Sequence, residues 1–233
     1  FVLEAQKRGL VAEGGLYMLV AQAAFAVEHF LDVKIPREKI DEVFEDIVRQ
    51  KRNVVLVGMP GCGKSTAILT AIGNKLPSFG GFLTKRIRDG KGHAAAFTLC
   101  APDGSREAVF LDCTSGKPVI HWEVFQTLAP ELMTGNIVIL DEIGGMELLC
   151  PEFMAALDAL LETDIPIIGV LKGDTAASAM IRRLGLSAEY EAAAHALRAR
   201  LLQDEHTLLY TCGQYDPHAL ELARAWVKEY AHD

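Results

Sequence analysis

The sequence predicts an α/β fold with a mostly parallel sheet flanked by helices. Several short apolar runs, often β-branched, have the composition of buried parallel strands. Helical segments separate these runs, and strands that alternate with helices are typical of a parallel sheet. The strand candidates are NVVLV at 53–57, NIVILD at 136–141, IPIIGVL at 165–171 and TLLYTC at 207–212.

Two helices are expected before the first strand. Residues 14–31 are apolar nearly all round, and a helix of that kind requires burial on more than one side. A second helix begins at Pro36, because a proline costs nothing at a first helical position whose N–H has no partner anyway. We interpret residues 1–50 as a small helical appendage, and residues 51–233 as one further domain.

After the first strand, a glycine-rich loop leads into a helix that begins at about Lys64. The period then changes to that of short strands, in GFLTKRI at 81–87, HAAAFTLC at 93–100 and REAVFLD at 106–112. Turn signals with Asp-Gly pairs separate these three segments. We therefore expect an antiparallel meander inserted at about 80–112.

Further helices are expected between and after the remaining strands. The segment 122–133 has helical spacing, and Pro130 shortens or kinks it. Other helices are predicted from Pro151 to about Glu162, at 175–184 and 188–203, and over the closing amphipathic segment DPHALELARAWVKEY, 216–230.

Composition excludes several classes of protein. The 233 residues carry a net charge of −8, which disfavours binding to nucleic acid through its phosphates. The five cysteines are odd in number and lack C-x-x-C spacing, which argues against disulfides and zinc and favours a reducing cytoplasm. The longest apolar stretch, residues 15–27, is too short to span a membrane. The chain starts with Phe1, so we expect a fragment or a processed piece.

The segment GMPGCGKST, residues 58–66, has the spacing of a Walker A phosphate loop, and it lies between a buried strand and a helix. Glycines allow consecutive backbone N–H groups to point at an anion, and the N-terminus of the following helix adds partial positive charge. Lys64 should bridge the β- and γ-phosphates, and Ser65 should offer its hydroxyl to Mg²⁺. The predicted nucleotide-binding residues are Gly58, Met59, Pro60, Gly61, Cys62, Gly63, Lys64, Ser65 and Thr66.

The second signal is IVILDEIGGMEL, residues 137–148, where an apolar strand ends in two acids. An Asp at such a strand end holds Mg²⁺ in phosphate-loop folds, so Asp141 is the predicted second metal ligand beside Ser65. Glu142 is placed to polarise a water for attack on the γ-phosphate. The alternative for both is a pair of turn or capping acids. Glu147 either supports the site or caps the helix that begins at Pro151.

Three stretches resemble the THEP-type nucleoside-triphosphatases, a P-loop family known from thermophiles and from a cancer-related human member. They are the loop itself, GFLTKRIR at 81–88, and DEIGGMEL at 141–148 with the trailing Phe153. The resemblance covers about residues 53–172. It implies a P-loop NTPase fold and Mg²⁺-dependent hydrolysis of nucleoside triphosphates such as ATP and GTP.

The chain departs from that family at two places. Arg86 stands where the family usually has Glu, and CGQYDPHAL at 212–220 occupies the place of an expected Asn-Arg-Asp element. Arg88 matches the family pattern and is our candidate for stabilising charge that develops on the γ-phosphoryl oxygens. Arg86 is a second candidate for that role.

The front of the chain resembles a different pair of enzymes. GLYMLVAQAA, residues 15–24, is similar to the closing helix of shikimate dehydrogenases, and NVVLVGMPGCGKST is similar to the start of shikimate kinases. The acidic residues and the Phe-Arg-x-x-Glu signature of those kinases are missing. Residues 1–50 are therefore expected to be the tail or remnant of an upstream shikimate-pathway domain, or a surface for a partner protein.

Weaker signals favour structural interpretations. Arg182 and Arg183 suit the C-terminal half of a helix, and Asp174 suits a helix cap better than a guanine-binding motif with Lys172. A core face, rather than a platform for a nucleotide base, is the better interpretation of the helical set Trp122, Phe125 and Leu128.

Three functions remain open on the sequence. The leading one is a nucleoside-triphosphatase with Glu142, Lys64 and Arg88 as catalytic residues. The second is a kinase for a small molecule such as shikimate, in which ATP consumption depends on the acceptor. The third is a slow nucleotide-gated switch that acts on a partner.

Overall fold

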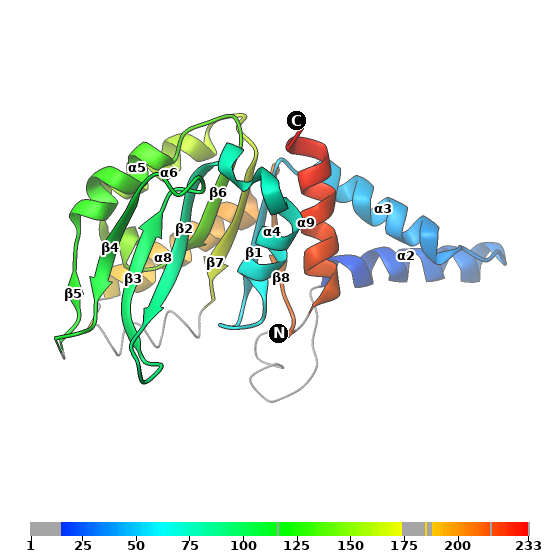
Figure 1. Cartoon of the computed structure of the whole chain (residues 1–233). Coiled ribbons are helices and arrows are strands. Elements are labelled where there is room, and N and C mark those ends of the chain that lie inside the picture. The colour runs from blue at the N-terminus through cyan, green and yellow to red at the C-terminus, as the bar shows by residue number, and fades with distance from the viewer. Residues whose placement is uncertain (1–14, 116, 174–184, 186–187, 215, 233) are drawn as a thin grey trace.

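The computed structural model describes residues 15–115, 117–173, 185, 188–214 and 216–232. A single eight-stranded sheet runs through the described molecule in the order β5-β4-β3-β2-β6-β7-β1-β8, with helices on both of its faces (Figure 1). The strands are β1 (Asn53–Gly58), β2 (Gly80–Arg88), β3 (Ala94–Cys100), β4 (Glu107–Asp112), β5 (Val119–Ile120), β6 (Val138–Ile143), β7 (Ile167–Lys172) and β8 (Thr207–Thr211).

The parallel core of the sheet confirms the predicted fold class. Strands β2, β6, β7, β1 and β8 pair with one another in parallel, as expected when helices connect successive strands. The described helices are α2 (Gly15–Leu31), α3 (Arg37–Arg49), α4 (Lys64–Ile72), α5 (Ala129–Leu132), α6 (Pro151–Leu161), α8 (Ala188–Gln203) and α9 (Pro217–Tyr230). The helix expected at 175–184 lies outside the described residues.

The meander is present but is not separate from the main sheet. Strands β2, β3 and β4 pair in antiparallel fashion, whereas β2 also pairs in parallel with β6. Gly81 lies opposite Ile139 in that pairing, and a Cβ there would approach the Ile139 carbonyl oxygen to 1.9 Å. With its φ of +88°, Gly81 is a position where only glycine fits, and it brings β2 close to β6.

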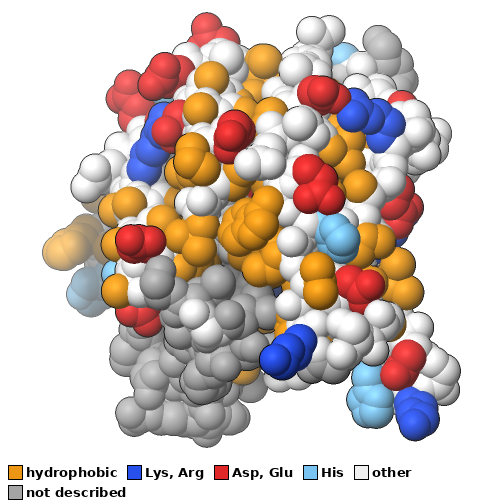
Figure 2. All heavy atoms as spheres, turned by 90° about the vertical axis from the view of Figure 1, so that its left-hand side faces the viewer, with side chains coloured by type: hydrophobic (Ala, Val, Ile, Leu, Met, Phe, Trp, Pro, Cys, Tyr) orange, Lys and Arg blue, Asp and Glu red, His pale blue; other side chains and the backbone are white. Residues whose placement is uncertain are grey.

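The free edge beyond the meander is formed by β4 and the two-residue strand β5, which the sequence did not predict. Val109 and Val119 are exposed on these strands. Figure 2 faces this edge and shows hydrophobic side chains gathered across the middle of the surface, with acidic side chains between them. The short, irregular β5 limits the length of edge that another strand could extend.

The helix expected at 122–133 forms as two unlike turns. Residues 124–128 form a π-helix, η2 (Val124–Leu128), and α5 follows at once. Pro130 lies in the first turn of α5, where its missing N–H costs no hydrogen bond. The boundary between the two turns falls just before Ala129, one residue ahead of the proline that was expected to shorten or kink the helix. Phe125 on η2 is buried in the apolar core that includes Phe153.

Two apolar cores lie on opposite faces of the sheet. One packs α4 and α9 against β1, and Trp226 is fully buried there, with its Nε1 donating to the Arg52 carbonyl oxygen at 2.8 Å. The other packs α6 and α8 against β6 and the meander, around the fully buried Phe153. Because both faces of the sheet are covered, a ligand can reach the sheet at the carboxyl ends of its parallel strands.

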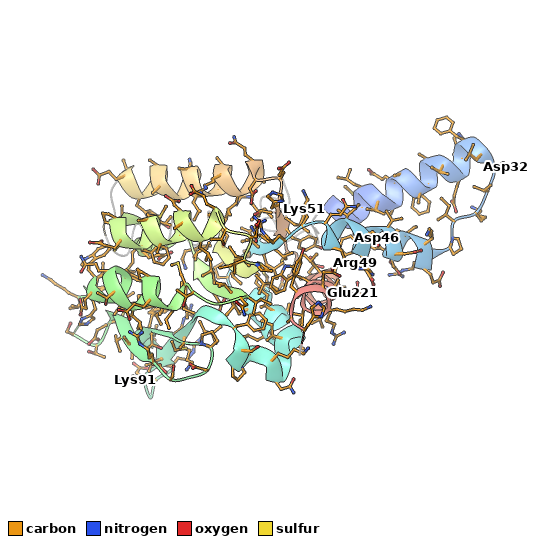
Figure 3. The ribbon with its side chains drawn as sticks, turned by 90° about the horizontal axis from the view of Figure 1, so that it is seen from above. Asp32, Asp46, Arg49, Lys51, Lys91 and Glu221 are labelled. Atoms are coloured by element: carbon orange, nitrogen blue, oxygen red, sulfur yellow. The ribbon has the colours of Figure 1, made fainter. Side chains whose placement is uncertain are left out.

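Helices α2 and α3 form a hairpin that extends away from the sheet. In Figure 3, Asp32 marks its tip and Lys91 lies at the opposite end of the molecule. Val20 on α2 and Phe44 on α3 are buried in the core that α4 and α9 form with β1. The Tyr17 ring stacks on His218, with ring centres 4.3 Å apart.

Much of the rest of α2 is exposed. Its large uncovered side chains are Met18, Leu19, Phe25, Val27, Phe30 and Leu31. Among the described residues, then, this apolar helix is covered on one side, although its sequence predicts burial on more than one. None of the described helices combines the length and apolar character needed to cross a membrane.

Candidate nucleotide site

A cavity of about 510 Å³ lies at the carboxyl ends of the parallel strands. This is the edge at which α/β sheets bind their ligands. Its polar wall is formed by Lys64, Ser65, Asp141, Glu142, Lys172 and Arg86. Its apolar wall comes largely from the meander, η2 and α6, and includes Phe82, Phe97, Leu99, Phe110, Phe125 and Phe153.

The predicted phosphate loop closes around its own lysine. Strand β1 ends at Gly58, and Gly61 and Gly63 have φ angles of +80° and +100°, which other residues rarely adopt. Lys64 begins α4 and is buried, and its Nζ donates to the carbonyl oxygens of Gly58 at 3.1 Å and Met59 at 2.9 Å. The cation and the N-terminus of α4 thus lie together in one curved loop, which is a site for an anion.

Ser65 and Asp141 meet across the sheet although 76 positions separate them. The Ser65 hydroxyl donates to Oδ1 of Asp141 at 2.6 Å. Asp141 is 5% exposed, and burial raises its pKa to about 6 against the opposing effect of the Ser65 hydrogen bond. Two hard oxygen groups side by side, one a desolvated carboxylate, fit a small divalent cation such as Mg²⁺.

The buried charge on Asp141 should destabilise the protein when no ligand compensates it. Because the folded pKa exceeds the ordinary value, the native state holds this proton more tightly, and stability falls as pH rises from about 4 to about 6. We expect Asp141→Asn, without nucleotide or metal, to raise the unfolding free energy by about 1–3 kcal/mol above pH 6. Chemical denaturation at pH 7.5 and at pH 4.5 measures this, and the gain should shrink at the lower pH.

Asp164→Asn is the matched control for that measurement, because the Asp164 side chain is fully exposed beside Arg52. Its effect should be small at both pH values. A loss of stability in Asp141→Asn at pH 7.5 would show that the Ser65 hydrogen bond outweighs the desolvation of the carboxylate.

Glu142 follows Asp141 on β6 and has a cationic partner. Its Oε2 lies 2.6 Å from Nζ of Lys172, which ends the neighbouring strand β7. Its backbone N–H donates to Oγ1 of Thr84 on β2 at 3.3 Å. The Lys172 pairing was not anticipated, since the sequence offered Lys172 only as part of a guanine-binding motif. Asp174, the other charged residue of that motif, lies outside the described residues.

Glu147 supports the turn that follows β6. It is buried, its Oε1 accepts the backbone N–H of Gly145 at 2.6 Å, and burial raises its pKa. The hydroxyl of Tyr190 on α8 donates to the Gly144 carbonyl oxygen at 2.8 Å. Helix α6 begins after Cys150 without a side-chain cap. Of the two roles left open by the sequence, support of the site is therefore the one that the contacts match.

The two arginines of β2 lie in different surroundings. Arg88 is at the far end of the strand, where its Nη1 donates to the Gly92 carbonyl oxygen at 2.7 Å, and it is not part of the cavity wall. Arg86 lines the cavity, with its guanidinium 5.4 Å from the centre of the Phe97 ring. The structure thus brings together all the predicted polar site residues except Arg88. Arg182 and Arg183 lie outside the described residues.

The aromatic lining of the cavity was not predicted from the sequence. Phe125 and Leu128 are buried as predicted for a core face, and Trp122 is half-buried beside them. Phe125 also reaches the cavity, and Phe97 and Phe110 line it from neighbouring strands. Alternation along β3 and β4 could have placed these rings on one face, but only the sheet order shows that this face adjoins the phosphate loop.

Comparisons with known proteins agree with this geometry. A family model described as NTPase matches residues 53–195. The nucleoside-triphosphatase THEP1 of Methanocaldococcus jannaschii is 32% identical over 132 residues, which cover 51% of this chain and 76% of that protein. The cancer-related nucleoside-triphosphatase homolog of Mus musculus is 32% identical over 144 residues, 52% of this chain and 75% of that protein. A crystal structure of THEP1 from Aquifex aeolicus covers 65% of this chain at 18% identity and a TM-score of 0.43, too low a similarity to support a conclusion.

Proposed function

Because this chain belongs to the NTPase family, we propose that it hydrolyses nucleoside triphosphates to the diphosphate and inorganic phosphate in the presence of Mg²⁺. The observation that carries the proposal is the convergence of Lys64, Ser65, Asp141 and Glu142 on one cavity from two separate parts of the chain. The relatives named nucleoside-triphosphatase support the same activity.

Each polar residue then has a role set by its position. Lys64 and the loop amides bind the phosphates, and Ser65 and Asp141 would hold Mg²⁺. When bound, Mg²⁺ neutralises phosphate charge and so favours departure of the diphosphate. Glu142 orients the attacking water and accepts its proton.

Lys172 serves as a positioning residue in this proposal. At 2.6 Å from Oε2 of Glu142, its ammonium fixes the direction of that carboxylate within the cavity. Arg86 is the cavity cation best placed to meet charge beyond the phosphates. The assignment of a charge-stabilising role to Arg88 stays a prediction, and turnover of Arg88→Gln tests it.

Phosphate release separates hydrolysis from the two other candidate functions. We expect release with ATP, GTP and other triphosphates in Mg²⁺, and loss of at least about 100-fold in EDTA because the phosphate charge is then uncompensated. The same panel is run with and without shikimate. Release that requires the acceptor would contradict hydrolysis and indicate a kinase, and near-zero release under all conditions would indicate a switch.

We further propose that residues 1–50 are an appendage that contacts an upstream domain or a partner protein, and that residues 51–233 carry the activity. The exposed apolar side of α2 supports this, since contiguous apolar surface on a soluble protein marks an interaction site. The cysteine spacing supports a reducing cytoplasm as its location.

A further inference from the structure

The proposed function gives the triphosphate a direction within the cavity. The loop amides cradle the α- and β-phosphates, and the lysine and the metal-binding hydroxyl reach the β- and γ-phosphates. Glu142, on β6, therefore marks the γ end. Strand order places β6 between the phosphate loop at the end of β1 and the meander, which begins with β2. With that direction, the proposed function puts the nucleoside on the side of the loop away from the meander.

The part of the cavity beyond the γ end is aromatic. Phe97 on β3 and Phe110 on β4 are half-buried neighbours, with ring centres 6.2 Å apart. Phe110 contacts Phe125 at 5.2 Å, and Phe125 contacts Phe153 at 6.2 Å. These four rings form a continuous wall, which we call the aromatic wall. Phe97 and Phe110 carry the ring surface on which another flat molecule can stack, and the buried Phe125 and Phe153 support these two rings from behind.

A cation and a hydroxyl border the aromatic wall. The guanidinium of Arg86 lies over the Phe97 ring and lines the cavity. Within the described part of the chain, no carboxylate forms an ion pair with Arg86, whereas its neighbour Lys85 pairs with Glu107 at 3.1 Å. Thr84, two residues earlier on β2, accepts the Glu142 N–H and so joins this border to the γ end.

The triphosphate chain would not bind to the aromatic wall, because its phosphate oxygens are charged and strongly hydrated. A cavity of about 510 Å³ is also within the range of sites that hold small organic ligands. Its apolar half with a few placed polar groups is the arrangement that binds a molecule with a flat apolar body and one charged group.

We propose that the aromatic wall and Arg86 bind a second small molecule, a flat aromatic anion, next to the γ-phosphate position. This inference rests on the proposed function for the direction of the nucleotide. The rings hold the apolar body, the guanidinium pairs with the anionic group, and nucleotide and second ligand occupy the cavity together.

Two fluorescent probes that differ by one charged group test this. They are 8-anilinonaphthalene-1-sulfonate, a flat aromatic anion, and N-phenyl-1-naphthylamine, which has the same rings without the sulfonate. We expect Arg86→Gln to weaken binding of the anionic probe about 10-fold, as for loss of a charge-assisted hydrogen bond, and to change binding of the neutral probe less than about 2-fold. Lys85→Gln, which removes the same charge from the same strand, should leave both probes unaffected.

The second measurement repeats the titration with Mg²⁺ and a saturating non-hydrolysable ATP analogue. The anionic probe should remain bound with unchanged stoichiometry. Competitive displacement by the analogue would show that the aromatic wall holds the nucleotide itself, and would overturn the proposal. Equal binding of the anionic probe to wild type and Arg86→Gln would overturn it as well, since the probe would then lie elsewhere, for example on α2.

Phosphate release is measured on the same samples, so that the two proposals fail separately. Probe binding without phosphate release contradicts hydrolysis. Phosphate release without binding of the anionic probe contradicts the second site.

Discussion

Glu142→Gln is expected to bind nucleotide normally and to lose most of its turnover. The substitution keeps the size of the side chain and removes the carboxylate that accepts a proton from the attacking water. General-base catalysis of this kind contributes about 10²–10⁴-fold to a rate, and the loss should appear in kcat rather than in nucleotide affinity. Single-turnover phosphate release measures the first quantity, and titration with a non-hydrolysable analogue measures the second.

The contacts of Glu142 explain why binding should survive. Its partner Lys172 and its neighbour Thr84 hold the β6 end in place through a side chain and a backbone N–H, and the glutamine keeps both kinds of contact. Glu162→Gln, an exposed glutamate near the end of α6, is the control and should leave turnover unchanged. Turnover of Glu142→Gln within about 3-fold of wild type would remove the general base from the mechanism.

Lys172 explains a second property of this glutamate. The Lys172 ammonium lies 2.6 Å from Oε2 of Glu142 and engages that oxygen of the carboxylate. The pair also holds the carboxylate in one direction, toward the residue that ends β7. In the proposed mechanism, a water bound by Glu142 therefore has a fixed position relative to the sheet. Because the phosphate loop follows β1 of the same sheet, the water also has a fixed position relative to the loop.

The sequence predicts the phosphate-binding and metal-binding half of the site well, because the motifs that form it are short and local in the sequence. The segment GMPGCGKST determines its own backbone conformation, since Gly61 and Gly63 are needed for positive φ angles and α4 must begin at the lysine. The resemblance to THEP-type enzymes is confirmed by the family match, and it rested on the same stretches. Asp141 and Ser65 could be paired in advance because a strand end and a loop of known type meet at the same edge.

The aromatic half of the cavity depends on contacts between distant segments, which the local sequence does not predict. Phe97 and Phe110 appear as ordinary strand residues until β2 is found to pair with β6, which brings the meander beside the phosphate loop. Alternation along a strand predicts that Arg86 and Arg88 point to the same face. In the structure, however, the register of β2 against β3 shifts between Ile87 and Arg88. Their surroundings differ because the hairpin turn after β2 offers the Gly92 carbonyl oxygen to Arg88 and leaves Arg86 facing the cavity.

Lys64→Ala is expected to weaken both nucleotide binding and turnover, unlike Glu142→Gln. In the structure the Lys64 ammonium, only 6% exposed, is held by the carbonyl oxygens of Gly58 and Met59. A buried cation with neutral partners is available to an anion, and its charge-assisted bonds to two phosphates are worth about 3–4 kcal/mol together. Affinity should therefore fall about 10²–10³-fold, and kcat/KM should fall further because charge on the γ-phosphoryl group grows during the reaction.

Lys91→Ala is the matched control, because Lys91 is exposed at the tip of the β2–β3 hairpin, far from the α2–α3 end of the molecule (Figure 3). It removes the same charge and the same side chain. A change seen in both variants would therefore come from the change in net charge and not from loss of the lysine in the phosphate loop. Calorimetric titration and phosphate release are compared for the three proteins. Unchanged affinity in Lys64→Ala would mean that the loop amides and α4 bind the phosphates alone, and that the lysine's place in the loop is structural.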